Sequence, residues 1–470
     1  MSASPPKTRP TQWRLREVVL LALPITLGNV SQTLVSLVDT LMVGQLGEVP
    51  LAGLGAATIL FLILFLVFSS LVQGVQVLCA RKLGEGALAE TGNVLHNALG
   101  LGLTVGLAAA TMGFVLPEQV MPAFMGGEST TLAPAEALRF GGDSAASIAA
   151  GYLHWRWGFG LPLVVLLFVF KGFYWGVGIS RLDLSVGLVA NLFNVLMNWL
   201  LIFGNLGFPR LGAPGAGLAS TLSAALALSI YALVAMRREF RGEYGTFRSM
   251  HLDLGMMGRI LRLSIPRAIQ GLAFGASAVF FMIIGNEVGE EGLAVSTVIW
   301  RFFGILVLVG VGIGTAASTL VGRELGAGRP DEANAYAWTA VRLGTVATAA
   351  AGLLCFAFPR QILGLFNLDA STVEAGVPVF RMMVLLQIMD AAGIILSKAL
   401  VGAGQVFFVM FAEILVSWAV CIPFALLFLE IFRDTNPLFG AWCGWAGYIL
   451  AWFLLMLFRW RRGSWRTTRV

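Results

Sequence analysis

The chain has 470 residues, of which 58% are hydrophobic and only 12% are charged, and its formal net charge is +6. About a quarter of the residues of a soluble protein are charged, so this chain has too few ionised groups to cover a water-exposed surface. The composition therefore excludes an ordinary soluble domain. Apolar runs long enough to cross about 30 Å of hydrocarbon recur along the whole sequence.

We predict twelve membrane-spanning helices, separated by glycine, proline and clusters of charge. The first helix follows a basic N-terminal segment, as the hydrophobic region of a signal peptide would. This apolar stretch is too long for a signal peptide and lacks its small-residue cleavage pattern, so we predict a membrane helix. In chain order the helices are expected at about 18–43, 52–79, 91–116, 148–176, 184–204, 214–236, 262–285, 293–321, 333–357, 376–402, 406–432 and 439–458.

The basic residues predict the orientation of these helices. Most of them lie in both terminal segments, in the connections 81–90, 237–262 and 323–332, and at Arg181, which all fall on one side of the membrane. The excess of Lys and Arg marks that side as cytoplasmic. Both termini are then cytoplasmic, as an even number of helices requires. We expect a multi-pass protein of the plasma (inner) membrane.

An internal repeat relates the two halves of the chain. Pro24 and Pro266 are 242 residues apart, and further glycine, arginine and proline residues recur at this offset. They pair Gly47 with Gly289, Arg81 with Arg323, Gly86 with Gly328 and Pro117 with Pro359, and Gly176 matches Gly402 at an offset of 226. The first half therefore has about sixteen extra residues, which we expect in the polar 126–147 connection.

The repeat predicts the fold class. Six helices per copy is an even number, so both copies cross the membrane in the same direction. We expect an all-α integral membrane protein whose twelve transmembrane helices form two parallel six-helix repeats around a central cleft. The predicted parts are a cytoplasmic tail (1–17), an N-lobe (18–240), a cytoplasmic connection (241–261), a C-lobe (262–458) and a basic cytoplasmic tail (459–470).

This architecture favours a transporter, because rocking two equivalent bundles exposes a cleft to each side in turn. An enzyme is not expected, since we find no catalytic constellation of Ser and His, paired Asp or a His-rich motif near mid-membrane. The chain lacks the Walker-type loop of an ATP-driven pump. Its four cysteines and three histidines are scattered, so they predict neither disulfides nor a metal centre. Because the basic residues form no patch with interleaved aromatics, we expect no nucleic-acid partner.

Several segments together resemble the multidrug and toxic compound extrusion (MATE) family. They are Leu23–Gly47 with Asp39, Ala80–Gly86, Asn194–Gly204, Leu211–Gly217 and Leu320–Gly328. The likeness covers about residues 15–460. It implies a secondary active antiporter that exports small amphiphilic organic compounds, such as drugs, toxins or metabolites, in exchange for protons or sodium ions. No cofactor is implied beyond that coupling ion, and we expect the protein to act as a monomer in the bilayer.

Asp39 is the first candidate for ion coupling. A carboxylate in hydrocarbon costs about 3 kcal/mol or more unless it is paired or hydrated, so we expect a functional role. Burial would favour its protonated form, as a group that binds and releases protons requires. Asn194 and Asn198 lie on one face of a helix and could point toward it. Hydrogen bonding between helices is the alternative for both amides.

The resemblance adds three points to this site. It places Asp39 in the N-lobe cation site, and it matches Tyr152 and Thr221 to the remaining polar members. The family usually has an aspartate where this chain has Asn198. That departure removes one negative charge, and since sodium prefers carboxylate and other hard oxygen ligands, it favours protons. An interfacial aromatic is the alternative interpretation of Tyr152.

Asp390 is the candidate in the C-lobe, where it matches the helix 10 acid of one branch of the family. The glutamate and tyrosine that cooperate with that acid are Phe274 and Leu386 here, so Asp390 could instead belong to an ion pair. Glu413 is expected at the membrane interface.

Lys171, Lys398, Gln270 and Arg301 are candidates for the cleft or for substrate binding. The two lysines could pair with Asp39 or Asp390, attract an anionic substrate, or extend to the cytoplasmic interface. A basic cleft would suit a flippase for lipid-linked intermediates or an exporter of anionic metabolites, which are the alternative functions. Such flippases usually have fourteen spans, whereas we predict twelve.

Overall fold

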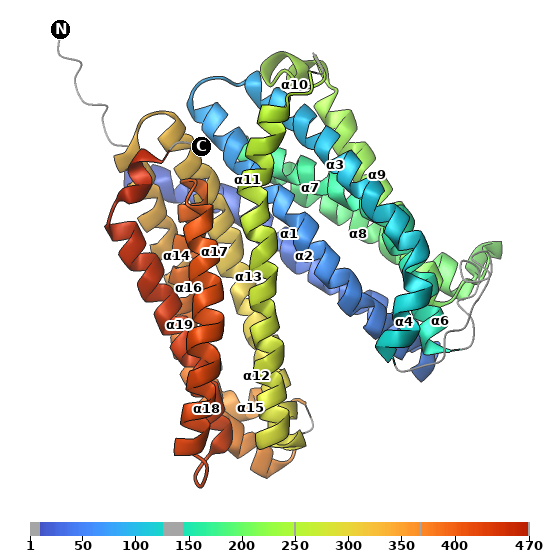
Figure 1. Ribbon diagram of the computed structural model, residues 1–470, viewed down its shortest axis with the longest axis vertical. Coiled ribbons are helices and arrows are strands. Elements are labelled where there is room, and N and C mark those ends of the chain that lie inside the picture. Colours follow the sequence, from blue (N-terminus) through green and yellow to red (C-terminus); the bar gives the residue numbers. More distant parts are fainter. Residues whose placement is uncertain (1–9, 126–143, 249–250, 367, 469–470) are drawn as a thin grey trace. The chain divides into compact units, whose positions relative to one another are not determined.

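A computed structural model describes residues 10–125, 144–248, 251–366 and 368–468 of the chain (Figure 1). Every regular element in these residues is a helix, and no strand occurs among them. Twelve of the helical segments are long and apolar enough to cross a membrane. The predicted class, an all-α membrane protein with twelve spanning helices, is confirmed.

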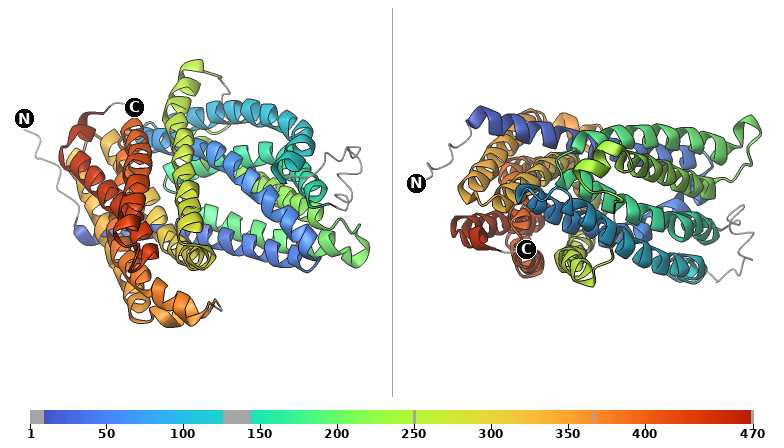
Figure 2. Two further views of the ribbon diagram at one scale, coloured as in Figure 1. Left: turned by 60° about the horizontal axis from the view of Figure 1, so that its bottom comes forward. Right: turned by 90° about the horizontal axis from the view of Figure 1, so that it is seen from above.

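Figure 2 shows the helices from two further directions. Among the described residues, three of the twelve spans contain a short π- or 3₁₀-helical segment, and the other nine are continuous α-helices. The first six are α1 (Thr11–Gly44), α2 (Glu48–Gly84), α3 (Glu90–Val115), α6, η1 and α7 (Ala145–Gly176), α8 (Ser180–Phe203) and α9 (Ala213–Ala235). The second six are α11, η3 and α12 (Leu254–Glu287), α13 (Glu290–Gly326), α14 (Pro330–Ala357), α16 (Ala370–Gly402), α17, η4 and α18 (Val406–Ile431) and α19 (Pro437–Arg461).

Short helices that the hydropathy pattern does not predict lie between or after the spans. They are α4 (Pro117–Met125), η2 (Asn205–Gly207), α10 (Arg238–Glu243), α15 (Pro359–Gly364) and η5 (Ser464–Thr467). The spans themselves begin or end several residues beyond the predicted limits, as at α2, expected at 52–79. Charged residues continue these helices past the hydrocarbon, with Glu48 in the first turn of α2 and Arg81 in the last. These charges complement the helix dipole.

The chain divides into two compact units. Unit 1 comprises Met1–Thr26 with Ile269–Val470, and unit 2 comprises Leu27–Ala268. Each division lies two residues after the repeated proline, Pro24 in α1 and Pro266 in α11. The predicted lobes, 18–240 and 262–458, assign each first helix to its own lobe, whereas the compact units divide both helices.

Ion pairs attach the start of α1 to unit 1. The Arg323 guanidinium donates to Glu17 at 2.9 Å, and Arg14 Nε donates to Glu332 at 3.1 Å. A methyl group on Gly312 of α13 would lie 2.0 Å from Thr26 Oγ1, so the two backbones approach closely there. The first four turns of α1 therefore belong with helices that come some 300 residues later in the chain.

The repeat is visible in the backbone of both units. α2 and α13 each have 37 residues and start 242 residues apart. Gly47 and Gly289 precede them with φ of 116° and 87°, a conformation that residues with a Cβ rarely adopt. The matched glycines thus mark the same turn in each half. The sixteen extra residues of the first half were predicted at 126–147, which lies largely outside the described residues.

A second matched pair of glycines marks the same close helix contact in each unit. A Cβ on Gly176 of α7 would lie 2.8 Å from the carbonyl oxygen of Gln76 in α2. A Cβ on Gly402 of α16 would lie 2.2 Å from the carbonyl oxygen of Ser318 in α13. Gln76 and Ser318 are again 242 residues apart. Small residues let helices of membrane proteins approach this closely.

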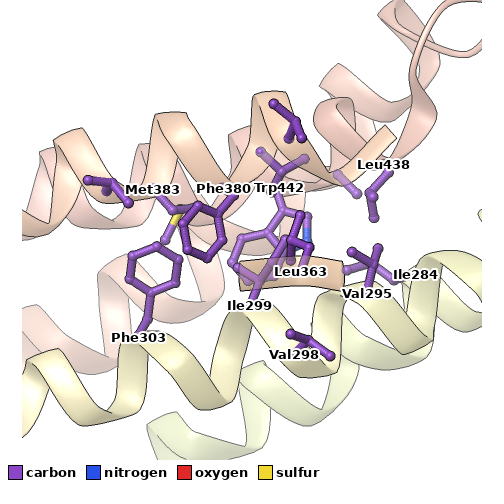
Figure 3. Close-up of a cluster of buried hydrophobic side chains, with 14 of the residues drawn as sticks. Ile284, Val295, Val298, Ile299, Phe303, Leu363, Phe380, Met383, Leu438 and Trp442 are labelled. Atoms are coloured by element: carbon purple, nitrogen blue, oxygen red, sulfur yellow. The ribbon is translucent and has the colours of Figure 1, made fainter. Parts of the chain in front are cut away.

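The core of unit 1 is apolar and aromatic (Figure 3). Phe303 of α13 contacts Phe380 of α16, with ring centroids 5.7 Å apart, and Met383 lies beside them. Trp442 of α19 is fully buried, and its indole nitrogen donates to Ser296 Oγ at 2.9 Å. Unit 1 is therefore stabilised mainly by the packing of large side chains.

Candidate ion-coupling site

Three of the predicted coupling residues lie together in unit 2. Asp39, five residues before the end of α1, accepts a hydrogen bond from the Asn198 amide at 2.5 Å. Asn194 lies one turn before Asn198 on α8, and the Asn198 nitrogen is also 3.0 Å from Asn194 Oδ1. Both amides are buried, with 4% and 0% of Asn194 and Asn198 exposed. The helical spacing of the two amides therefore places them on the face of α8 that meets Asp39.

The Asn194 amide can bond in two orientations. In one, its nitrogen donates to Ser220 Oγ of α9 at 3.3 Å. Turned by 180°, the nitrogen lies 2.9 Å from Asp39 Oδ1 and the oxygen accepts from Ser220. In either orientation Asn194 links α9 to the cluster around Asp39. Ser220 is a member that the sequence analysis missed.

The carbonyl oxygen of the Asn198 side chain is buried and has no hydrogen-bond partner among the described residues. A buried polar atom without a partner costs about 1–3 kcal/mol, so such atoms need a ligand or a water. This oxygen belongs to the same amide that holds Asp39. The site can thus accept a proton donor or a cation beside the carboxylate.

Arg156 supplies a positive charge to the cluster. It follows Tyr152 by one helical turn and interacts electrostatically with both Tyr152 and Asp39. Its guanidinium lies 4.5 Å from the ring centre of Phe61. The sequence analysis did not select Arg156, although a basic residue between Trp155 and Trp157 inside an apolar span is the signal that could have found it. Tyr152 is buried, with 8% exposed.

Thr221 lies against a wide turn of the fourth span. The span is α-helical in α6 (Ala145–Leu153) and α7 (Gly160–Gly176) but π-helical in η1 (His154–Phe159). The Thr221 hydroxyl donates to the carbonyl oxygen of Trp155 at 2.8 Å, or to that of Gly217 at 3.0 Å. Its hydrogen is thus committed to the backbone beside the π-helix. π-Helical turns occur frequently at functional sites, and this one carries Arg156.

Asp390 lies in a second polar cluster, in unit 1. It is 8% exposed, and its Oδ2 accepts a hydrogen bond from Gln387 at 3.1 Å. Glu413 of α17, which we expected at the interface, interacts electrostatically with Asp390. The Tyr448 hydroxyl of α19 donates to Glu413 at 2.8 Å. The fold of unit 1 therefore brings together two carboxyl groups and a phenol from three separate helices, α16, α17 and α19.

The four candidates for the cleft do not share one environment. Lys171 belongs to unit 2 and lies 3.5 Å from Asp183, so it pairs with neither Asp39 nor Asp390. The stem of Lys398 packs on Gly314, where a methyl group would lie 2.9 Å from its Cγ. Arg301 is exposed, and Gln270, the last residue of α11, is buried. Because Lys171 and Lys398 are one residue out of register in the repeat, they leave their helices in different directions.

Asp183 is the acidic residue that the sequence analysis missed. We predicted a helix at 184–204, which left Asp183 in the basic turn at Arg181. The helix α8 begins at Ser180 instead, so Asp183 lies within its first turn, with 4% exposed. A charged residue at a helix end gives no hydropathy signal for burial.

Comparisons with known proteins agree with this architecture. The sequence model of the MatE family matches residues 24–200 and 266–427. The "Probable multidrug resistance protein NorM" of Streptococcus pneumoniae R6 is 27% identical, covering 95% of each chain. The NorM protein of Burkholderia mallei, with the same description, is 28% identical, covering 98% of this chain and 95% of its own.

Solved structures share the fold. A MATE protein in complex with MaD3S aligns with a TM-score of 0.84 at 21% identity, covering 97% of both chains. A MOP superfamily transporter from Pyrococcus furiosus, described as having a binding pocket of reverse polarity, aligns with a TM-score of 0.82 at 21% identity. That alignment covers 99% of this chain and 100% of the other.

Proposed function

Since the chain belongs to the MatE family, whose members are transporters and not enzymes, we propose that it exports small amphiphilic organic compounds in exchange for protons. It is a multi-pass membrane protein. We place it in the plasma membrane with both termini cytoplasmic, as the basic connections indicate. Transport would proceed by alternating access, the mechanism expected for a repeat of two six-helix units.

The observation that carries this proposal is the hydrogen bond between Asn198 and Asp39 inside a membrane helix. Ionised Asp39 is stabilised there by the Asn198 amide and by the charge of Arg156. Protonated Asp39 needs no counter-charge, so Arg156 could then bind another anion or move away from Asp39. A single proton can therefore alter the electrostatics of the whole cluster.

Protons fit this cluster better than sodium ions. Sodium prefers several oxygen ligands with carboxylates among them, and this cluster has a single carboxylate beside the amide and hydroxyl oxygens of Asn198, Asn194 and Ser220. The guanidinium of Arg156 would also repel a second cation near Asp39. A proton needs one acceptor atom and leaves the amide bonds in place.

The names of the relatives support small organic molecules as substrates. The NorM proteins that match this chain are named as probable multidrug resistance proteins. Two solved structures of the same fold are described as MATE in complex with MaL6 and MaD3S. We infer a similar class of substrate for this chain.

Unit 1 provides a second group for proton coupling in this proposal. Asp390 and Glu413 would repel each other if both were ionised, so a shared proton stabilises the pair. Tyr448 and Gln387 each hold one of the two carboxyl groups. Replacing Asp390 with Asn would remove the repulsion and the need for that proton. We expect a partial loss of coupling from this change.

The proposal is tested with purified protein in liposomes and with ethidium as the transported probe. A proton gradient should drive ethidium movement, and a sodium gradient alone should not. Asp39→Asn should lower the proton-driven rate about tenfold or more, because it removes the exchangeable carboxyl group. Asp331→Asn is the matched control, since Asp331 is 82% exposed and its ion pair with Arg466 lies at the surface. Full proton-driven transport by Asp39→Asn would contradict the site assignment.

A further inference from the structure

Unit 2 holds a second buried carboxyl group, that of Asp183. Its Oδ1 accepts a hydrogen bond from the Tyr231 hydroxyl and lies 3.5 Å from Lys171 Nζ. Its Oδ2 accepts from the Trp175 indole nitrogen at 3.0 Å. The partners come from α7 and α9, and Tyr174 donates to the backbone oxygen of Tyr231 at 2.9 Å behind them. Three polar groups from two neighbouring helices therefore surround the Asp183 carboxyl group: the Tyr231 hydroxyl, the Trp175 indole and the Lys171 ammonium.

The pair of Lys171 and Asp183 has one buried and one accessible side. The Asp183 side chain is 4% exposed, whereas that of Lys171 is 30% exposed. Ser180, three residues before Asp183 on α8, is 1% exposed, and its hydroxyl has no hydrogen-bond partner among the described residues. Arg181 lies in the same first turn of α8, at the end of the helix that is predicted to be cytoplasmic.

Contacts between α1 and α8 lie along the way from this cluster to Asp39. Asp183 Oδ2 would lie 3.9 Å from a methyl group on Gly28. Farther along, Asn191 donates to Ser31 Oγ at 2.8 Å. Farther still, Asn198 donates to Asp39.

The order of these contacts is the same on both helices. Positions 28, 31 and 39 of α1 meet positions 183, 191 and 198 of α8, so the two helices run in the same direction. Fifteen residues of helix separate Asp183 from Asn198, a rise of about 22 Å. One carboxyl group thus stands at each end of this stretch of α8, and the hydrogen bond between Asn191 and Ser31 lies between them.

We propose that Asp183 is a second proton-binding site, which exchanges protons between Asp39 and the water at the basic side of the membrane. This inference rests on the proton exchange proposed above. The contact of Ser31 with Asn191 would hold the waters that bridge the two carboxyl groups, since a proton cannot cross this distance without them. Neither Asp183 nor Lys171 is assigned a role in this exchange by the comparison with known proteins.

The proton balance of the exchange is simple. Protonated Asp39 gives its proton to a bridging water and becomes a carboxylate, and Asp183 takes a proton from the same chain of waters. While Asp183 is neutral, water hydrates Lys171 through its exposed part. Release of the proton to water at the basic side restores the ion pair of Lys171 and Asp183. No group is consumed, and one proton moves inward per cycle.

The alternative role of the cluster is structural, as an ion pair that ties α7, α8 and α9 together. The two roles predict different results for one double variant. Asp183→Asn alone leaves Lys171 without its partner, whereas Asp183→Asn with Lys171→Met removes both charges and the need for pairing. A structural pair predicts that the double variant regains both thermal stability and transport. A proton site predicts that it regains stability only.

The test measures proton-driven ethidium transport in liposomes, ethidium binding in detergent and thermal stability for each variant. We expect Asp183→Asn and the double variant to transport about tenfold more slowly than the wild type, with ethidium binding within about threefold. Asp183→Glu should retain transport because it keeps a carboxyl group. Asp331→Asn is again the control for removing a surface acid, and should transport at the wild-type rate.

Infrared difference spectra between acidic and alkaline pH give a readout that does not depend on a transported probe. The wild type should show a protonated carboxyl band that is missing from Asp183→Asn. Identical spectra, or wild-type transport by the double variant, would overturn the role of Asp183. If Asp183→Asn transports normally while Asp39→Asn does not, the proposed function stands without this site. If protons drive no transport in the wild type, the proposed function fails together with this inference.

Discussion

Asp39 and Phe281 stand at the same position of the repeat, 242 residues apart, but in opposite environments. Asp39 accepts a hydrogen bond from Asn198 and interacts with Arg156. Phe281 packs edge-on against Trp300, with ring centroids 5.3 Å apart and an interplanar angle of 90°. The same turn of the repeat is therefore polar in unit 2 and aromatic in unit 1.

Phe281→Asp should destabilise unit 1, because the new carboxyl group would replace a ring that packs against Phe280 and Trp300. A carboxylate within a membrane helix costs about 3 kcal/mol, so we expect a clear fall in the thermal midpoint. Phe281→Leu keeps an apolar side chain and is the control. Thermal unfolding of the purified protein checks both. A Phe281→Asp variant as stable as Phe281→Leu would show that this position is hydrated.

Asn198→Asp should change the coupling ion. It places a second carboxyl group beside Asp39 and so provides the charge and the oxygen ligands that sodium prefers. We expect a sodium gradient to stimulate ethidium transport about fivefold in this variant and not in the wild type. Asn205→Asp, which adds the same charge in the turn after α8, should have no effect. A sodium response in the wild type would contradict our choice of protons.

Thr221→Val should destabilise the wide turn of the fourth span. The variant keeps the shape of the side chain but removes the hydrogen bond to the Trp155 carbonyl, at a cost of about 1–3 kcal/mol. Thr221→Ser retains the hydroxyl and should behave nearly like the wild type. Thermal unfolding distinguishes them. If Thr221→Val lost transport without any loss of stability, Thr221 would have a direct role in coupling.

Gly402→Ala should destabilise the contact between α16 and α13. The added methyl group would lie 2.2 Å from the Ser318 carbonyl oxygen, so the two backbones must separate. Overpacking of this kind costs about 1–3 kcal/mol. Gly187→Ala is the matched control within α8, because nothing lies within 4 Å of its added methyl group. A similar thermal midpoint for both variants would mean that the helices have room to adjust.

The twelve spans could be predicted from the sequence because each one is a long apolar run bounded by turn residues. The ends could not, since hydropathy falls at the edge of the hydrocarbon while the helix continues into charged residues such as Glu48. The π-helical turn at His154–Phe159 has no signal in the sequence pattern. Its partner, the hydroxyl of Thr221, comes from a helix some 60 residues later.

The grouping of Asp39, Asn194 and Asn198 could be predicted because intramembrane polar residues are rare and two of them share a helix face. Asp183, the partner of Lys171, could not be predicted. Asp183 lies eight residues before Asn191 in the same helix. Its side chain is enclosed by Tyr231 and Trp175, which donate hydrogen bonds to it and which only the fold brings near. Glu413 likewise sits in an apolar run, and only the fold brings it near Asp390.

The division of α1 and α11 has a consequence for how such a chain could have arisen. Unit 1 contains the first 26 residues of the chain, and unit 2 contains the residues up to Ala268, which begin the second repeat. A protein made of a single repeat would leave the start of its first helix without the neighbours it packs on. Two copies of that protein would supply those neighbours to each other by exchanging the segments, which is a domain-swapped dimer. Duplication and fusion of the gene would join the two copies into one chain, in which the first helix of each repeat still begins in the other unit. Fragments cut in the 241–253 connection should accordingly fold only when they are produced together.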